Sequence, residues 1–218
     1  MEVREAFDVN LLDSEARFPD ETHPEFRTSI VTLANQSINL SYRILKALSL
    51  HFGKDDDFFA KQHRRILKGD NASALRSLYY PPILGELKPG YIRCGEHSDY
   101  GTFTLLYQDQ YPGLQVKSAA GSWVDAVPIP QTILDFLISV NIGDLLEMWT
   151  AGEYPATKHR VLIPDEELTK TTARQSIVLF VHPDDEVVVA PLTSADPRFP
   201  PVTALEHVTK RFSQTYKY

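Results

Sequence analysis

Two histidines and one aspartate in this sequence are of the right types to hold a metal ion. His97 and Asp99 lie in the segment GEHSDYG, and His159 follows much later at the start of another expected strand. On a strand, residues i and i+2 point to the same face, so the pattern predicts an imidazole and a carboxylate side by side. The pair alone also fits a polar strand end with a hydrogen-bonded histidine. With His159, the three side chains can occupy one face of a metal and leave the other open, as in non-haem Fe(II) oxygenases.

A second pair of residues could bind an anion near such a metal. Arg174 and Ser176 precede the apolar run IVLF and would share one face of a strand. A guanidinium and a hydroxyl together suit a carboxylate, because the planar fork donates charge-assisted hydrogen bonds. Taken alone, the pair also fits a surface arginine at the start of a strand. A buried guanidinium would need an anionic partner, and 2-oxoglutarate can supply one while its keto-acid end chelates iron.

The elements that must position these residues divide the chain in two. Residues 24–51 place apolar residues near helical spacing, with Gly53 as a stop, and a second helix is expected from about Asp56 to Ile66. From Leu75 onward, short runs rich in Tyr, Ile, Val and Thr alternate with Pro and Gly, which predicts a sandwich, barrel or jelly roll. The predicted organisation is a helical packing segment, residues 1–74, followed by a β-rich core, residues 75–218, that ends in a helix over residues 201–216.

Composition limits the classes of partner. The chain has 218 residues, enough for one domain with a substantial core, and a net charge of -7 that disfavours nucleic acid. Its single cysteine, Cys94, cannot form an internal disulfide, which fits a reducing compartment. The sequence shows no signal peptide and no run of about 20 apolar residues, so we expect a cytoplasmic protein without a membrane partner.

The sequence resembles the isopenicillin N synthase-like 2-oxoglutarate/Fe(II)-dependent dioxygenases. The matching segments follow one another in family order between residues 75 and 185, and their order is more specific than any one of them. They are LRSLYYPP (75–82), GEHSDYGTFTLLYQD (95–109), PGLQV (112–116), WV (123–124), NIGD (141–144), WT (149–150), HRV (159–161) and RQS (174–176).

The resemblance implies a mainly β fold with flanking helices, a double-stranded β-helix or jelly roll, with the metal inside. It implies three cofactors or cosubstrates, which are Fe(II), 2-oxoglutarate and O2. Iron would be held by His97, Asp99 and His159. The distal carboxylate of 2-oxoglutarate would be held by Arg174, Ser176 and Tyr80. No catalytic residue beyond the metal ligands is implied.

The chain also departs from the family pattern. Leu78 stands where many plant members have asparagine. Four histidines match no ligand position and are expected to be structural or exposed: His51, His63, His182 and His207. Family members usually begin with a substantial N-terminal region that is missing here. A fragment or shortened product would have a more open pocket and could associate with itself through the exposed surface.

The resemblance thus implies a dioxygenase that oxidises, most simply by hydroxylation, a small organic molecule with release of succinate and CO2. Three alternatives remain open. The chain could be a shortened, catalytically weak relative that acts by binding, an Fe(II) oxidase of related fold that uses no 2-oxoglutarate, or a hydrolytic zinc enzyme, since the same ligands can hold Zn(II). Nothing in the sequence identifies the substrate.

Overall fold

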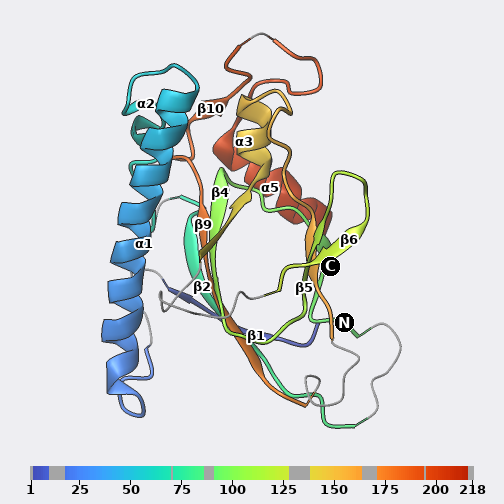
Figure 1. Cartoon of the computed structure of the whole chain (residues 1–218). Helices are drawn as coiled ribbons and strands as arrows, with labels where there is room; N and C mark the ends of the chain where they lie inside the picture. Colours follow the sequence, from blue (N-terminus) through green and yellow to red (C-terminus); the bar gives the residue numbers. More distant parts are fainter. Residues whose placement is uncertain are drawn as a thin grey trace.

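Two β-sheets face each other across the middle of the molecule, and one long helix lies along the outer side of the larger sheet (Figure 1). The computed structural model describes residues 2–9, 18–69, 71–85, 91–127, 138–163, 171–193 and 195–215. The arrangement is the jelly roll expected from the sequence, with helices at its flanks.

The larger sheet has five strands in the order β1-β2-β9-β4-β7, and each described pair of neighbours is antiparallel. The strands are β1 (Glu5–Val9), β2 (Ala74–Tyr80), β9 (Arg174–Val181), β4 (Phe103–Gln108) and β7 (Ile138–Ile142). Residues 1–74, which the sequence predicts to be a helical packing segment, therefore also contribute an edge strand to this sheet.

The smaller sheet has four strands in the order β3-β8-β5-β6, again antiparallel. They are β3 (Cys94–His97), β8 (His159–Val161), β5 (Leu114–Lys117) and β6 (Trp123–Asp125). A short ribbon of β10 (Val188–Val189) and β11 (Val202–Thr203) lies outside the two sheets. Residues 128–137, which precede β7 in the predicted β-rich core, lie outside the described residues.

Apolar side chains form two separate clusters because successive residues of each central strand point to opposite sides. Leu75, Leu105 and Leu179 point outward and are completely buried in the main core, where α1 covers them. Leu78 and Val178 point inward and belong to a smaller cluster between the sheets. The inner faces of the strands are therefore left to line a cavity.

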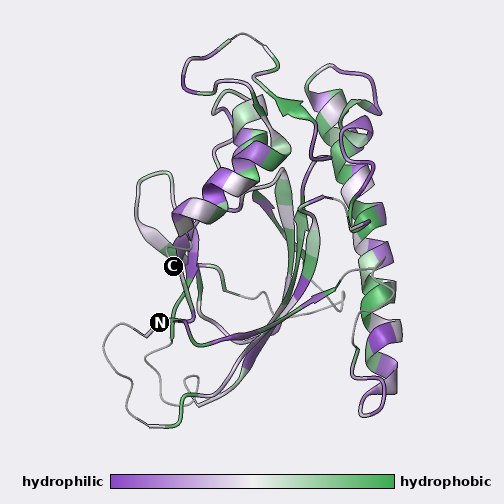
Figure 2. Ribbon diagram, turned by 180° about the vertical axis from the view of Figure 1, so that it is seen from behind, coloured by the Kyte–Doolittle hydropathy of each residue, from purple (hydrophilic) through white to green (hydrophobic). Residues whose placement is uncertain are grey.

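Helix α1 (Pro24–His51) begins with proline at its first turn and ends at Phe52, followed by Gly53 at a φ of 64°. The helix and its glycine stop are confirmed. The expected apolar residues of the helix pack against the main core, and its fully buried positions also include small and polar residues. These positions are Ile30, Ala34, Ser37, Ser41, Leu45 and Ser49. Each of these serine hydroxyls donates to the carbonyl four residues earlier, so burial leaves none unsatisfied. Small side chains allow the helix to lie close to the sheet, and Figure 2 shows hydrophobic residues on both facing surfaces.

The second expected helix is much shorter than predicted. Helix α2 spans only Phe58–Lys61, because the next backbone groups bind another segment. The carbonyl of Gln62 accepts a hydrogen bond from the amide of Asp184, and the Asp184 carboxylate accepts one from the amide of Arg65. These contacts replace the helical ones.

The two remaining helices are α3 (Asp144–Trp149) and α5 (Ala204–Thr215). Helix α5 starts later than predicted, and Tyr216 at its expected end lies outside the described residues. Val208 is buried as expected, whereas Leu205 and Phe212 are half exposed. No helix in the described ranges combines the length and hydropathy that a membrane crossing requires.

Candidate metal centre and anion pocket

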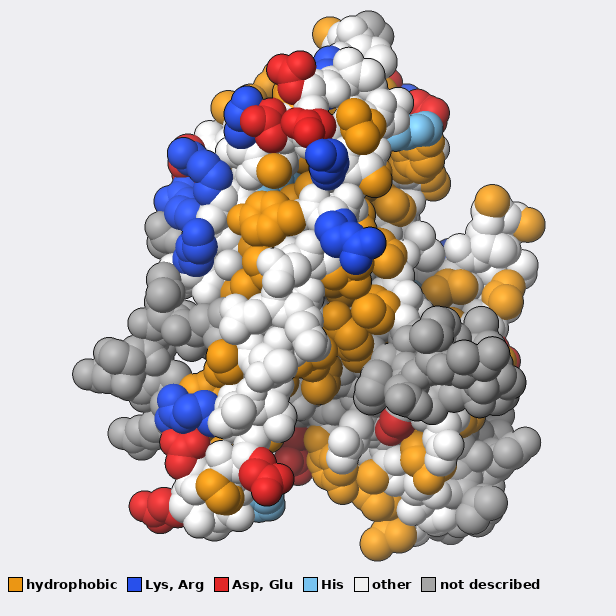
Figure 3. All heavy atoms as spheres, turned by 60° about the vertical axis from the view of Figure 1, so that its left-hand side comes forward, with side chains coloured by type: hydrophobic (Ala, Val, Ile, Leu, Met, Phe, Trp, Pro, Cys, Tyr) orange, Lys and Arg blue, Asp and Glu red, His pale blue; other side chains and the backbone are white. Residues whose placement is uncertain are grey.

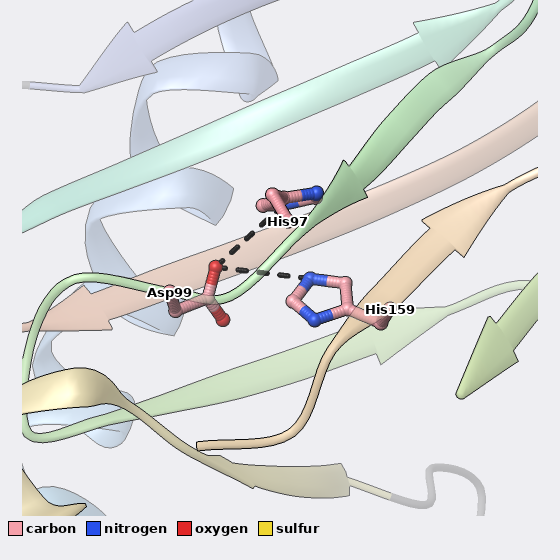
Figure 4. Close-up of side chains that lie close together, drawn as sticks. All are labelled: His97, Asp99 and His159. Carbon is pink, nitrogen blue, oxygen red and sulfur yellow. Dashed lines mark ion pairs between the residues drawn. The ribbon is translucent and has the colours of Figure 1, made fainter. Parts of the chain in front are cut away.

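The structure brings His97, Asp99 and His159 together inside the jelly roll (Figure 4). His97 and His159 are register partners on β3 and β8, and their ring centroids lie 4.2 Å apart. Their Nε2 atoms lie 3.8 Å and 3.7 Å from Oδ1 of Asp99. One ligand atom from each residue lies within 4.8 Å of the others, which leaves space for one ion between them.

Asp99 reaches this position differently from what the sequence pattern predicts. Strand β3 ends at His97, and Asp99 lies in the loop that follows. The loop is fixed by its backbone, because the carbonyl of Asp99 accepts a hydrogen bond of 2.9 Å from the amide of Asp144 at the start of α3. The two side chains therefore meet through a turn and not through the alternation of a strand.

Backbone carbonyls orient both imidazoles. Nδ1 of His97 donates to the carbonyl of Gly95 at 2.8 Å, and Nδ1 of His159 donates to that of Thr157 at 3.0 Å. A carbonyl only accepts, so the hydrogen is on Nδ1 and the Nε2 lone pair points toward Asp99. Burial lowers the pKa of His97, and the neighbouring His159 lowers it further. His97 is therefore kept neutral, the form that binds a metal.

Asn141 of β7 holds the aspartate in place. Its Nδ2 donates to Oδ2 of Asp99 at 2.9 Å, which leaves Oδ1 facing the two histidines. The backbone at Gly143 lies very close to the loop that carries Asp99. A Cβ at Gly143 would overlap the carbonyl oxygen of Gly101 and would lie 3.2 Å from that of Asp99. The segment NIGD was recognised in the sequence, but the role of its asparagine becomes visible only in the structure.

The donor set fits a mononuclear Fe(II) centre. Two imidazoles and one carboxylate converge on one point, and His97 and Asp99 also line two cavities of about 470 Å³ and 250 Å³. The smaller cavity is also lined by His159. A metal held by the three residues would therefore lie beside both cavities.

The smaller cavity, which we call the inner cavity, ends at Arg174, Ser176 and Tyr80. Tyr80 and Arg174 are register partners on β2 and β9, and Leu78 and Ser176 are the next inward-facing pair. Arg174 and Ser176 are buried while Gln175 between them is exposed, so the predicted common face is confirmed. The sheet thus places all three predicted anion-binding residues at one end and the metal ligands at the other.

Arg174 is buried without a carboxylate partner in the described part of the chain. Its Nη2 donates to Oε1 of Gln108 at 2.9 Å and its Nε to the carbonyl of Tyr111 at 3.3 Å. Nη1 is buried and has no hydrogen-bond partner among the described residues. An unsatisfied guanidinium nitrogen is what a missing carboxylate would leave, so this end of the cavity fits the distal carboxylate of 2-oxoglutarate.

Tyr80 adds a neutral hydroxyl to this site. Burial raises the pKa of Tyr80, although the guanidinium of Arg174 opposes part of the rise. The phenol is therefore protonated at neutral pH and can donate a hydrogen bond to an anion. Leu78, which replaces the asparagine of many plant relatives, is buried in the wall and offers no such donor.

The larger cavity, which we call the outer cavity, shares His97 and Asp99 with the inner cavity. Its wall includes Arg4, Arg76, Phe180, His182 and Phe212, none of which the sequence analysis assigned to the site. Phe180 and His182 continue the inward face of β9 that begins with Arg174 and Ser176, so counting every second residue would have found them.

The four histidines without a predicted role differ in their surroundings. His63 is completely buried between the carbonyl of Phe59 and the hydroxyl of Thr102, and burial lowers its pKa to about 4. His51 is exposed beside Tyr154, and His207 lies 3.2 Å from Asp144. His182 is buried in the wall of the outer cavity.

Comparison with known proteins shows the family to which the chain belongs. The sequence profile of the 2OG-Fe(II) oxygenase superfamily matches residues 71–183, more than half of the chain. The 2-oxoglutarate-dependent dioxygenase htyE of Aspergillus rugulosus is 33% identical over 86% of this chain and 57% of its own length. The dioxygenase gloF of Glarea lozoyensis is 34% identical over 86% of this chain and 58% of its own. The chain thus spans a little over half the length of these relatives.

A solved structure shows the same fold. A full-length protein of Neurospora crassa, crystallised in complex with alpha-KG, superposes with a TM-score of 0.83 at 29% identity, covering 99% of this chain and 67% of that one. The profile match spans every strand of the two sheets except β1, and all the residues that line the inner cavity apart from Arg4. The chain belongs to the 2OG-Fe(II) oxygenase superfamily.

Proposed function

We propose that this protein is a 2-oxoglutarate- and Fe(II)-dependent dioxygenase that oxidises, most simply by hydroxylation, a small organic molecule with release of succinate and CO2. One observation carries the proposal. A single cavity is lined at one end by His97, Asp99 and His159, and at the other by a buried guanidinium, Arg174, whose Nη1 lacks a partner among the described residues.

Each group of residues has a separate task in this activity. The three metal ligands hold iron, which when bound supplies the redox chemistry between O2, 2-oxoglutarate and the substrate. Arg174, Ser176 and Tyr80 hold the distal carboxylate, so that the keto-acid end faces the metal. Asn141 fixes the carboxylate of Asp99 through its 2.9 Å hydrogen bond. The outer cavity takes the substrate, and the walls of both cavities exclude water from the reacting groups.

The alternatives differ in what they require of the inner cavity. An Fe(II) oxidase without 2-oxoglutarate or a zinc hydrolase does not require a buried arginine with an unsatisfied nitrogen in the wall of the same cavity. A protein that acts only by binding would keep the cavity but show no turnover.

Anaerobic titration tests the proposal directly. Adding 2-oxoglutarate to the Fe(II)-loaded protein is expected to produce the weak visible charge-transfer band of the iron–keto-acid chelate. Admission of O2 with a panel of small organic molecules is expected to yield succinate. A protein that binds Fe(II) but neither gives the band nor binds 2-oxoglutarate by calorimetry would support the oxidase alternative, and binding without succinate would support the binding-only alternative.

We also propose that the chain associates with itself. Strands β6 and β7 are the edges of their sheets as far as these are described, and they carry exposed valines, Val124 and Val140. Apolar side chains are also exposed beside α1 (Figure 3). Open edges with apolar residues favour pairing with a second chain. Sedimentation velocity is expected to show a dimer that Val140→Lys weakens, whereas a monomer at all micromolar concentrations would contradict the idea.

We further propose that the protein acts in the cytoplasm. The support is its single cysteine, Cys94, which is buried and unpaired. Cell fractionation that recovers the protein from a secreted or membrane fraction would contradict this location.

A further inference from the structure

A second buried arginine, Arg93, lies beside Tyr80 of the inner cavity and has no role in the site described so far. Arg93 has 0% of its surface exposed. Its Nη2 donates to the carbonyl of Thr172 at 3.4 Å, and its Nε and Nη1 are buried without a hydrogen-bond partner in the residues that the structure describes. Buried arginines normally pair with a carboxylate, so this one needs an explanation.

Arg93 lies beside the residues that would hold the distal carboxylate. Its guanidinium carbon is 5.9 Å from the centre of the Tyr80 ring, and that of Arg174 is 5.1 Å from the same centre. Burial lowers the pKa of Arg93, and the positive charge of Arg174 lowers it further. Two positively charged groups are therefore buried in one region, and the charge of each makes burial of the other less favourable.

The described acidic residues do not neutralise this pair by contact. Asp109 is the carboxylate whose charge acts on Arg93, and its effect is smaller than that of burial or of Arg174. Its two oxygens already accept hydrogen bonds from the backbone amides of Tyr111 and Gln175. Two guanidiniums buried without a contacting carboxylate are unfavourable in the empty protein, and an anion bound next to them would remove that cost.

We propose that Arg93 is a positioning residue of the 2-oxoglutarate site, a second cation that strengthens binding of the distal carboxylate without touching it. Arg93 is not among the residues that line the inner cavity, so it acts through its charge and through Tyr80, which lies against both arginines. The inference rests on the proposed function, because it requires that the inner cavity binds 2-oxoglutarate. Arg93 therefore lowers the stability of the empty protein and raises its affinity for 2-oxoglutarate.

Arg93→Met tests this with two measurements, the Tm of the empty protein and the affinity for 2-oxoglutarate. Methionine keeps an apolar chain of similar reach and removes the charge. The Tm of the metal-free, 2-oxoglutarate-free protein is expected to rise by about 2 to 4 °C, because an uncompensated buried charge is gone. The Kd for 2-oxoglutarate, from anaerobic calorimetry on the Fe(II)-loaded protein, is expected to rise on the order of tenfold, as for a charge acting over several ångströms at a dielectric constant near 20.

Two controls separate this effect from others. Oxalate can chelate iron but has no distal carboxylate, so its Kd is expected to be the same in Arg93→Met and in the wild type. Arg198→Met removes the same charge from an exposed position beside Asp196, and its Kd for 2-oxoglutarate is expected to stay unchanged.

A purely structural role for Arg93 predicts the reverse pattern. A lower Tm or an insoluble Arg93→Met protein would overturn the proposal, as would a Kd for 2-oxoglutarate within about twofold of wild type. A different result would contradict the proposed function. It is wrong if the wild type does not bind 2-oxoglutarate, whereas wild-type binding that Arg93→Met leaves intact defeats only the assignment of Arg93.

Discussion

Alanine in place of His97, Asp99 or His159 is expected to abolish stoichiometric Fe(II) binding and, with it, all turnover. Each change removes one of the three protein donors that converge on the same point. Asp99→Ala has a further cost, since it leaves two imidazoles 4.2 Å apart with no negative charge to balance a dication and takes away the acceptor of the Asn141 amide. Iron content after anaerobic loading and desalting measures the effect directly.

The chain offers a matched control for this experiment. His51 is an exposed histidine that contacts only Tyr154 among the described hydrogen-bond partners, so His51→Ala should keep full iron content. The unfolding temperature of each metal-free variant should stay near that of the wild type, because the ligands form no large part of the core. Unchanged iron stoichiometry in two of the three ligand variants would show that the metal assignment is wrong.

Part of the site could be predicted because the positions of Arg174 and Ser176 follow strand periodicity, whereas Asp99 lies in a loop that strand periodicity does not describe. Arg174 and Ser176 share a face for the simple reason that β9 is extended, and the buried-exposed-buried pattern of residues 174–176 confirms it. His159 opens β8 as expected. Spacing along one strand is a local property, so it can be read without knowing which strands are neighbours.

What the sequence could not provide depends on contacts between distant segments. Asn141 reaches Asp99 only because β7 lies beside β4, and helix α2 ends early only because Asp184 binds the backbone near Gln62. The serine-lined face of α1 was missed because hydropathy treats serine as polar. In a helix, a buried serine satisfies itself on the preceding turn.

Arg93 shows the same limit at the site itself. In the sequence it is one more charged residue before the metal-binding segment, with nothing to mark it as buried. Its neighbours include Tyr80 of β2 and Thr172 just before β9, and Thr172 is 79 residues away along the chain. Only the folded structure shows that two arginines lie beside the same tyrosine, Tyr80.

Among the changes considered, replacement of Arg174 is expected to lower the affinity for 2-oxoglutarate the most. Arg174→Ala and Arg174→Lys should both raise the Kd for 2-oxoglutarate while iron binding stays intact. Loss of one partner of a buried charged hydrogen bond costs on the order of 2 to 5 kcal/mol, which is roughly thirtyfold to several thousandfold in affinity. Anaerobic calorimetry with 2-oxoglutarate, alongside measured iron content, separates the two properties.

Lysine should fail here although it keeps the charge, and the geometry explains why. Gln108 and the carbonyl of Tyr111 fix two nitrogens of the Arg174 guanidinium, which leaves Nη1 without a hydrogen-bond partner among the described residues. A single ammonium group cannot hold both neighbours and also present a planar pair of donors to a carboxylate. Gln175→Ala is the matched control, because Gln175 lies on the same strand with its side chain on the exposed face. If Arg174→Lys binds 2-oxoglutarate within about twofold of the wild type and of Gln175→Ala, the fork is not what recognises the carboxylate, and the inner cavity must bind its ligand in another way.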